Sequence, residues 1–74
     1  MIEQIKKTAV HLADIFIYDE DEFEKEYDNI KDSKNIIPIQ NLAQVYYNIK
    51  TGIITREVGL ILQNNILTGL GVAE

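Results

Sequence analysis

The fold follows from one stretch of the sequence, Lys50-Thr51-Gly52-Ile53-Ile54-Thr55-Arg56-Glu57. Gly52 suits the positive φ at which helices commonly end. Thr55 is a good N-cap, because its hydroxyl can accept a hydrogen bond from a free N–H in the first helical turn. The segments on both sides have the apolar spacing of helices. We therefore predict a helical hairpin near the C-terminus.

The same spacing predicts helices elsewhere in the chain. Four helices are predicted in all, and apolar residues recur every three or four positions over the first, third and fourth of them. The predicted helices span about residues 2–18, 20–32, 38–51 and 56–68. The sequence thus predicts an all-α fold, a small bundle of three to four helices in one domain (1–74) that ends in the hairpin.

The second and third helices have recognisable starts. Asp19 is a good N-cap, and Glu22 stands at the capping-box position. Tyr18 and Phe23 are spaced to form a hydrophobic staple across this start. Pro38 suits the first turn of the third helix, and we expect the preceding residue, Ile37, to be extended.

The fourth helix is apolar on two sides. We expect Val58, Ile61, Leu62 and Ile66 to face the third helix. Leu60 and Leu67 then point nearly the other way. Such a helix is either sandwiched within the fold or shared with another chain.

The size of the chain favours a partner. A domain of 74 residues is near the limit at which one core gives only about 3–5 kcal/mol of net stability. The sequence contains no cysteine and one histidine, which excludes disulfides and leaves too few Cys and His ligands for a conventional structural zinc site. A protein partner or a second copy is the remaining supplement, and we expect no cofactor.

The net charge of −5 is concentrated in the middle of the chain. This acidic surface is predicted to consist of Asp19, Glu20, Asp21, Glu22, Glu24, Glu26 and Asp28. It does not fit an EF-hand, since Glu24 and Ile30 stand where glycine and the bidentate glutamate belong. No cluster of Lys or Arg marks a nucleic-acid surface, and no stretch is long and apolar enough to span a membrane.

No residue pattern predicts catalysis. His11 and Asp14 share the polar side of the first helix, but no nucleophile is expected nearby, and we interpret His11 as a surface histidine. We therefore predict a protein that is not an enzyme and has no catalytic residues. The absence of a leader segment favours the cytoplasm.

Residues 42–67, through the Gly52-Ile53-Ile54-Thr55 turn and Glu57, resemble the SHOCT (short C-terminal domain) helical hairpin of bacterial proteins. Val58 replaces the aromatic residue usual in that family, and the last helix is not rich in lysine. The resemblance implies protein–protein or oligomerisation work without catalysis.

The leading hypothesis is a small interaction or oligomerisation module, a regulatory protein of a bacterium, phage or mobile element. Its predicted contact residues are Leu60, Leu67, Gln40, Gln44 and Tyr47. Two alternatives stay open. The acidic surface can imitate a phosphate backbone and so inhibit a DNA- or RNA-binding protein, or residues 56–68 can be the recognition helix of a helix-turn-helix, which the shortage of cations disfavours.

Overall fold

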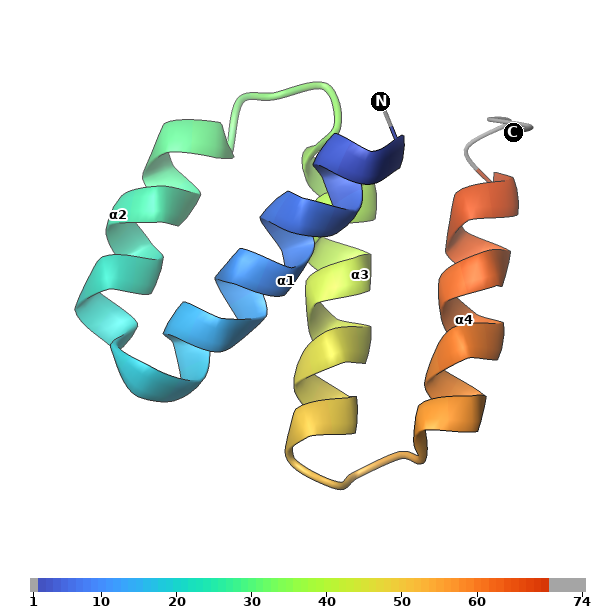
Figure 1. Ribbon diagram of the computed structural model, residues 1–74. Coiled ribbons are helices and arrows are strands. Elements are labelled where there is room, and N and C mark those ends of the chain that lie inside the picture. Colours follow the sequence, from blue (N-terminus) through green and yellow to red (C-terminus); the bar gives the residue numbers. More distant parts are fainter. Residues whose placement is uncertain (1, 70–74) are drawn as a thin grey trace.

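The computed structural model describes residues 2–69, which form four helices and no strand. The helices are α1 (Ile2–Tyr18), α2 (Glu20–Ile30), α3 (Ile36–Lys50) and α4 (Arg56–Gly69), shown in Figure 1. The predicted all-α fold is therefore confirmed. The predicted boundaries of α1 are also confirmed, whereas α2 ends two residues earlier than expected and α4 one residue later.

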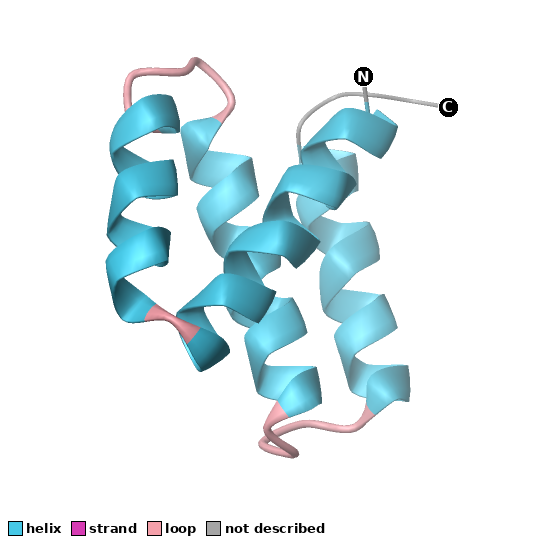
Figure 2. Cartoon of the chain, turned by 60° about the vertical axis from the view of Figure 1, so that its left-hand side comes forward, coloured by secondary structure: helices cyan, strands magenta, loops and turns pink. Residues whose placement is uncertain are grey.

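The helices are arranged around a central pair. α1 packs against α3 and also against α2, while α4 packs mainly against α3 (Figures 1 and 2). The outer positions are therefore held by the acidic helix α2 on one side and by α4 on the other. The Cα trace measures 33 × 29 × 15 Å, so the bundle is thin in one direction.

The core lies between α1 and α3. Its buried apolar side chains within residues 3–69 are Ile5, Ala9, Leu12, Ala13, Ile39, Leu42 and Val45. Their spacing of three or four residues in each helix turns one side of α1 toward one side of α3. Partly buried side chains of α2 and α4, such as Ile30 and Ile66, complete this cluster.

The end of α3 confirms the predicted stop. Gly52 has a φ of +80° and is the single described residue with a positive φ. The N–H of Ile53 donates to the carbonyl of Asn48 (2.9 Å), and the N–H of Gly52 donates to that of Ile49 (3.2 Å). This pair of bonds is the Schellman motif, which satisfies carbonyls left free at the helix end.

Both predicted N-caps are formed. The Thr55 hydroxyl accepts a hydrogen bond from the N–H of Val58 at 3.2 Å, at the start of α4. A carboxylate oxygen of Asp19 accepts one from the N–H of Glu22, also at 3.2 Å. The extended backbone of Asp19 (φ −158°, ψ 94°) separates helix α1 from helix α2.

The predicted staple at this break is wrong. Tyr18 is 82% exposed, and Phe23 instead packs edge-to-face on Phe16, with ring centroids 5.0 Å apart. The N–H of Asp19 donates to the carbonyl of Ile15 (2.7 Å), so it is not free for the second bond of a capping box. Both partners at this turn come from α1, since Phe16 packs on Phe23 and the carbonyl of Ile15 accepts the N–H of Asp19.

The start of α3 also differs from the prediction. α3 begins at Ile36, and Ile37 is helical instead of extended. Pro38 is thus the third helical residue, where the missing N–H would have had no intrahelical partner. The carbonyl of Asn35 accepts the N–H of Ile39 at 3.1 Å, which closes the first turn around the proline.

Candidate functional site

The orientation of α4 differs from the prediction. Gly59 is the buried residue of this helix, and its neighbours on the packed side are Gln63 and Ile66. Val58 and Ile61, which we expected to face α3, are exposed. α4 is therefore turned by about 100°, one residue of helical rotation, from the predicted position.

The contact at Gly59 explains this rotation. A Cβ atom at Gly59 would lie 2.3 Å from Cδ1 of Ile49 and 2.6 Å from its Cγ1. A side chain at this position would therefore hold α4 away from α3. Because Gly59 has no side chain, the α4 backbone can approach the Ile49 side chain directly. This contact determines which side of α4 packs against α3.

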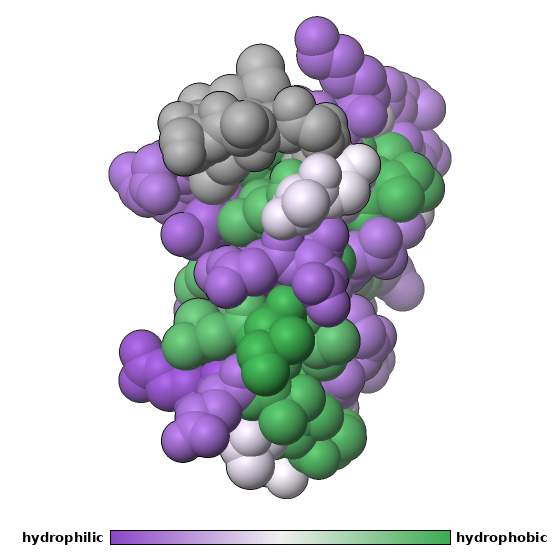
Figure 3. All heavy atoms as spheres, turned by 90° about the vertical axis from the view of Figure 1, so that its right-hand side faces the viewer, coloured by the Kyte–Doolittle hydropathy of each residue, from purple (hydrophilic) through white to green (hydrophobic). Residues whose placement is uncertain are grey.

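The rotation leaves a group of apolar side chains on the outer surface, which we call the α4 patch. Ile61 at its centre is 60% exposed, and Ile53 in the preceding turn is 66% exposed. Figure 3 shows that apolar side chains, drawn in green, are most densely gathered in the lower half of this side of the molecule. The members of the α4 patch are Ile53, Val58, Leu60, Ile61 and Leu62.

The two leucines predicted as contact residues are separated. Leu60 is 48% exposed within the α4 patch. Leu67 is partly buried and packs against the core cluster. The prediction that both point away from the bundle is therefore wrong for Leu67, because the rotation brings it inward.

A second surface feature lies between α2 and α3, with α1 as its floor. It is a groove of about 590 Å³, which we call the aromatic groove. Its aromatic lining residues are Phe16, Phe23, Tyr27 and Tyr47. The predicted contact residues Gln40, Gln44 and Tyr47 all lie along its α3 wall, so the structure brings these three together.

Hydrogen bonds order the walls of the aromatic groove. The Gln40 amide donates to the Tyr27 hydroxyl, which connects α3 to α2. The Gln44 amide donates to the side-chain carbonyl of Asn48 at 3.0 Å. The sequence predicted Gln40 and Gln44 as contact residues but did not indicate that α2 stands opposite to them.

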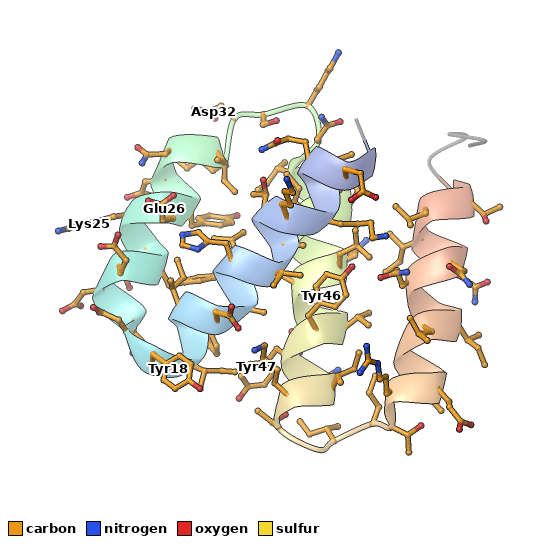
Figure 4. The ribbon with its side chains drawn as sticks, viewed as in Figure 1. Tyr18, Lys25, Glu26, Asp32, Tyr46 and Tyr47 are labelled. Atoms are coloured by element: carbon orange, nitrogen blue, oxygen red, sulfur yellow. The ribbon has the colours of Figure 1, made fainter. Side chains whose placement is uncertain are left out.

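The predicted acidic surface is carried almost entirely by α2. Six carboxylates and Lys25 lie on this short helix, and Lys25 points away from the bundle (Figure 4). Asp28 is 3.5 Å from the ammonium of Lys31, at exposed positions. Within residues 2–69 no Lys or Arg lies within 4 Å of the other α2 carboxylates. The helix therefore presents largely unpaired negative charge.

Polar contacts also hold α3 to its other neighbours. The Tyr46 hydroxyl donates to the side-chain oxygen of Gln63 in α4 at 2.7 Å. Burial, and next the charge of Glu3, raise the pKa of Tyr46 above its usual value. The Lys50 ammonium lies 2.5 Å from a carboxylate oxygen of Asp14 in α1. This hydrogen bond and the charge of Asp14 raise the pKa of Lys50.

The structure does not pair the two residues of α1 that were considered for acid–base chemistry. His11 is exposed, and its predicted companion Asp14 is paired with Lys50 instead. Among residues 2–69 no group of three or more His, Cys, Asp or Glu side chains is placed to hold a metal ion. Over the same range, no helix combines the length and the hydrophobicity that crossing a membrane requires.

Comparison with protein-family models, with curated proteins and with solved structures finds no match to this chain. The arrangement of the hairpin lends no support to the helix-turn-helix hypothesis. α3 and α4 run side by side in opposite directions (Figures 1 and 2), whereas the two helices of that motif cross steeply. Arg56 is also the single Lys or Arg in α4.

Proposed function

We propose that this chain is a small, non-catalytic interaction module that associates with a second copy of itself through the α4 patch. The observation that carries the proposal is the α4 patch, the group of exposed apolar side chains around Ile61. Such side chains gain about 25 cal/mol for each Å² of apolar area that a partner covers. The hairpin that presents them fits the oligomerisation role implied by the SHOCT resemblance.

Charge favours a second copy as the occupant. The α4 patch itself is uncharged, and Arg56 and Glu57 at its border have opposite signs. The acidic helix α2 lies at the opposite edge of the bundle (Figure 1), so two copies that meet through α4 keep their negative helices far apart. A patch that meets its own copy about a twofold axis also forms a closed dimer.

Core size favours the same conclusion. The core within residues 3–69 rests on a few small and medium side chains of α1 and α3, with Leu12 and Leu42 as the largest fully buried ones. α4 adds partial burial on one side only. Small domains of this kind commonly gain stability from association.

The test is sedimentation equilibrium over a wide concentration series, with the wild type and Ile61→Glu. We expect a monomer–dimer equilibrium for the wild type and a monomer for Ile61→Glu. Because Ile61 is 60% exposed, the variant should keep the helical circular dichroism of the wild type. Ser33→Glu, an exposed loop position, is the matched control for added charge. A wild type that stays monomeric at the highest concentration contradicts the proposal.

We place this module in the cytoplasm, as a regulatory protein of a bacterium, phage or mobile element. The acidic, cysteine-free composition supports this placement. Expression of a tagged chain followed by cell fractionation tests it. Recovery in the membrane or secreted fraction would contradict it.

A second candidate function is imitation of a phosphate backbone by α2. The observation in its favour is that the α2 carboxylates other than Asp28 have no Lys or Arg partner in the described part of the chain. The measurement is a native pull-down with mass spectrometry, comparing the wild type with a variant neutralised at Asp19–Asp28. Mimicry predicts a nucleic-acid-binding partner whose affinity falls with salt. An affinity indifferent to ionic strength rules it out.

A further inference from the structure

We infer that the aromatic groove binds a cationic amphipathic helix of another protein. The apolar side of that helix would fill the groove, and its Lys or Arg side chains would lie against α2. The aromatic groove is separate from the α4 patch. The inference therefore stands or fails independently of self-association.

The dimensions of the groove suit a helix. Its volume of about 590 Å³ lies between α2 and α3. Its α3 wall runs from Gln40 to Tyr47, about 10.5 Å or two helical turns at 1.5 Å per residue. A helix along this wall presents three apolar side chains, at positions i, i+3 or i+4, and i+7, which is the spacing by which helices bind grooves.

The aromatic rings form a continuous set of anchors. Phe16 of α1 contacts Phe23 of α2 (centroids 5.0 Å apart) and Tyr47 of α3 (5.3 Å). Phe23 also stacks on Tyr27, with centroids 6.1 Å apart. Phe16 nevertheless stays 40% exposed. Rings held in place by one another and still open to a partner are the kind of residue that dominates binding energy in interfaces.

The negative charge of α2 beside the groove favours a cationic helix as the ligand. The hydrogen bond from Gln40 to Tyr27 shows that Tyr27 is on the side of α2 that faces α3. Glu24 and Glu20 precede Tyr27 by three and seven residues and share this side of the helix. Both are exposed, so they form a negative rim along the groove.

The opposite wall does not neutralise this rim. α3 carries no charged residue before Lys50, and its groove-lining side chains are three amides, Ala43 and Tyr47. Lys or Arg side chains of a bound helix would pair with the rim carboxylates and lie over the aromatic rings. A second copy of this chain fits less well, because its α4 offers Arg56 alone.

The test uses a synthetic, fluorescein-labelled helical peptide with leucine at i, i+3, i+4 and i+7 and with Lys or Arg at the other positions. Binding to the full chain is followed by fluorescence anisotropy. The ionic strength is varied from about 0.01 to about 1 M, over which the screening length falls from about 30 to about 3 Å. We expect affinity that decreases with salt but persists in part at the highest salt, since the apolar anchors are not screened.

Two pairs of variants locate the binding site. Glu20→Gln with Glu24→Gln removes the rim charge and should weaken binding about tenfold at about 0.15 M ionic strength, where the screening length of about 8 Å limits the effect to nearby charges. Glu22→Gln with Glu26→Gln removes the same charge, and likewise one like-charged i,i+4 pair, from the other side of the Phe23 stripe. At the same ionic strength this control should change the affinity by less than about twofold, because its carboxylates lie away from the groove.

The second pair of variants tests whether a bulky side chain in the groove prevents peptide binding. Gln44→Trp places a large ring at an exposed groove position and should weaken binding about tenfold or more. Asn29→Trp introduces the same ring at an exposed position on the far side of α2 and should leave binding unchanged. Circular dichroism checks that all variants are folded.

Three results would overturn the inference. One is a peptide that fails to bind at any salt concentration. Another is equal weakening by the rim pair and its control, which indicates attraction to the acidic helix without use of the groove. The last is equal binding by a scrambled peptide whose leucines do not share one side. Retention of peptide binding by the monomeric Ile61→Glu variant would show that the two surfaces act separately.

Discussion

Gly59 of α4 lies directly against the side chain of Ile49 in α3, with no room for a Cβ atom between them. This relationship sets the distance between the two helices of the hairpin. It also sets the rotation of α4, because only the glycine side of the helix can come so close. The exposed α4 patch is a consequence of that contact.

Gly59→Ala is expected to act with opposite sign in two backgrounds. Alanine favours a helix by about 1 kcal/mol over glycine, but overpacking against Ile49 costs about 1–3 kcal/mol. We therefore expect destabilisation of up to about 2 kcal/mol in the wild type. In an Ile49→Ala background the obstructing atoms are gone, and the same change should stabilise by about 1 kcal/mol. Urea unfolding of the four chains measures this, and one sign in both backgrounds would contradict it.

Gly52→Ala is expected to destabilise the hairpin by about 1–2 kcal/mol, since a side chain disfavours the left-handed conformation. A Cβ atom there meets nothing within 4 Å, so the loss comes from the backbone at φ +80° and not from a clash. Gly52→Asn should lose less, because asparagine tolerates this conformation better. Thermal unfolding compares the two variants. Equal losses would show that the positive φ is not what matters.

Asp19→Ala is expected to destabilise the protein by about 1 kcal/mol through loss of the α2 cap. The 3.2 Å bond to the N–H of Glu22 disappears, and that donor is left to water. Asp19→Asn keeps an acceptor oxygen and serves as the control. Chemical denaturation monitored by circular dichroism measures both. If asparagine is as destabilising as alanine, the charge matters at this site and the hydrogen bond does not.

The free energy of unfolding is expected to fall as pH rises above about 10. The ordinary pKa of tyrosine is 10.0, and the pKa of Tyr46 is raised in the folded protein, first by burial and then by Glu3. The unfolded state therefore releases its proton first and gains stability relative to the folded state. The raised pKa of Lys50 acts in the same direction, since its pairing with Asp14 is lost once the ammonium deprotonates.

Tyr46→Phe should flatten part of this alkaline decline, at the expense of about 1 kcal/mol near neutral pH from the lost bond to Gln63. Thermal unfolding between neutral pH and pH 11 checks both effects, about one unit beyond the ordinary tyrosine pKa. Tyr18→Phe is the control, because Tyr18 is 82% exposed. An alkaline decline unchanged by Tyr46→Phe would contradict the assignment.

The sequence was sufficient for those features that depend on local chemistry. Helical periodicity predicted α1 and α3, and each of these helices buries one well-defined side, with Leu12 and Leu42 at the centre of the core. The stop at Gly52 and the caps at Asp19 and Thr55 depend on neighbouring backbone groups alone. These features are the same whatever the helices pack against.

The orientation of α4 was not predictable in this way. Hydrophobic patterning counts side chains, and Gly59 has none, so the residue that decides the packed side contributes nothing to the pattern. Ile61 was consequently assigned to the interior and Leu67 to the exterior. The aromatic groove was missed for a related reason. Its width depends on how far α2 stands from α3, which no local signal encodes.

The attachment of the outer helices has a consequence for amide hydrogen exchange. α1 and α3 hold the core, whereas α2 packs mainly against α1 and α4 mainly against α3. Either outer helix can thus open without separating α1 from α3. Its amides should therefore exchange through local openings that require less free energy than global unfolding. Amides near Leu12 and Leu42 should exchange slowest. A protein that covers the α4 patch would then slow exchange in α4 and leave exchange in α2 nearly unchanged.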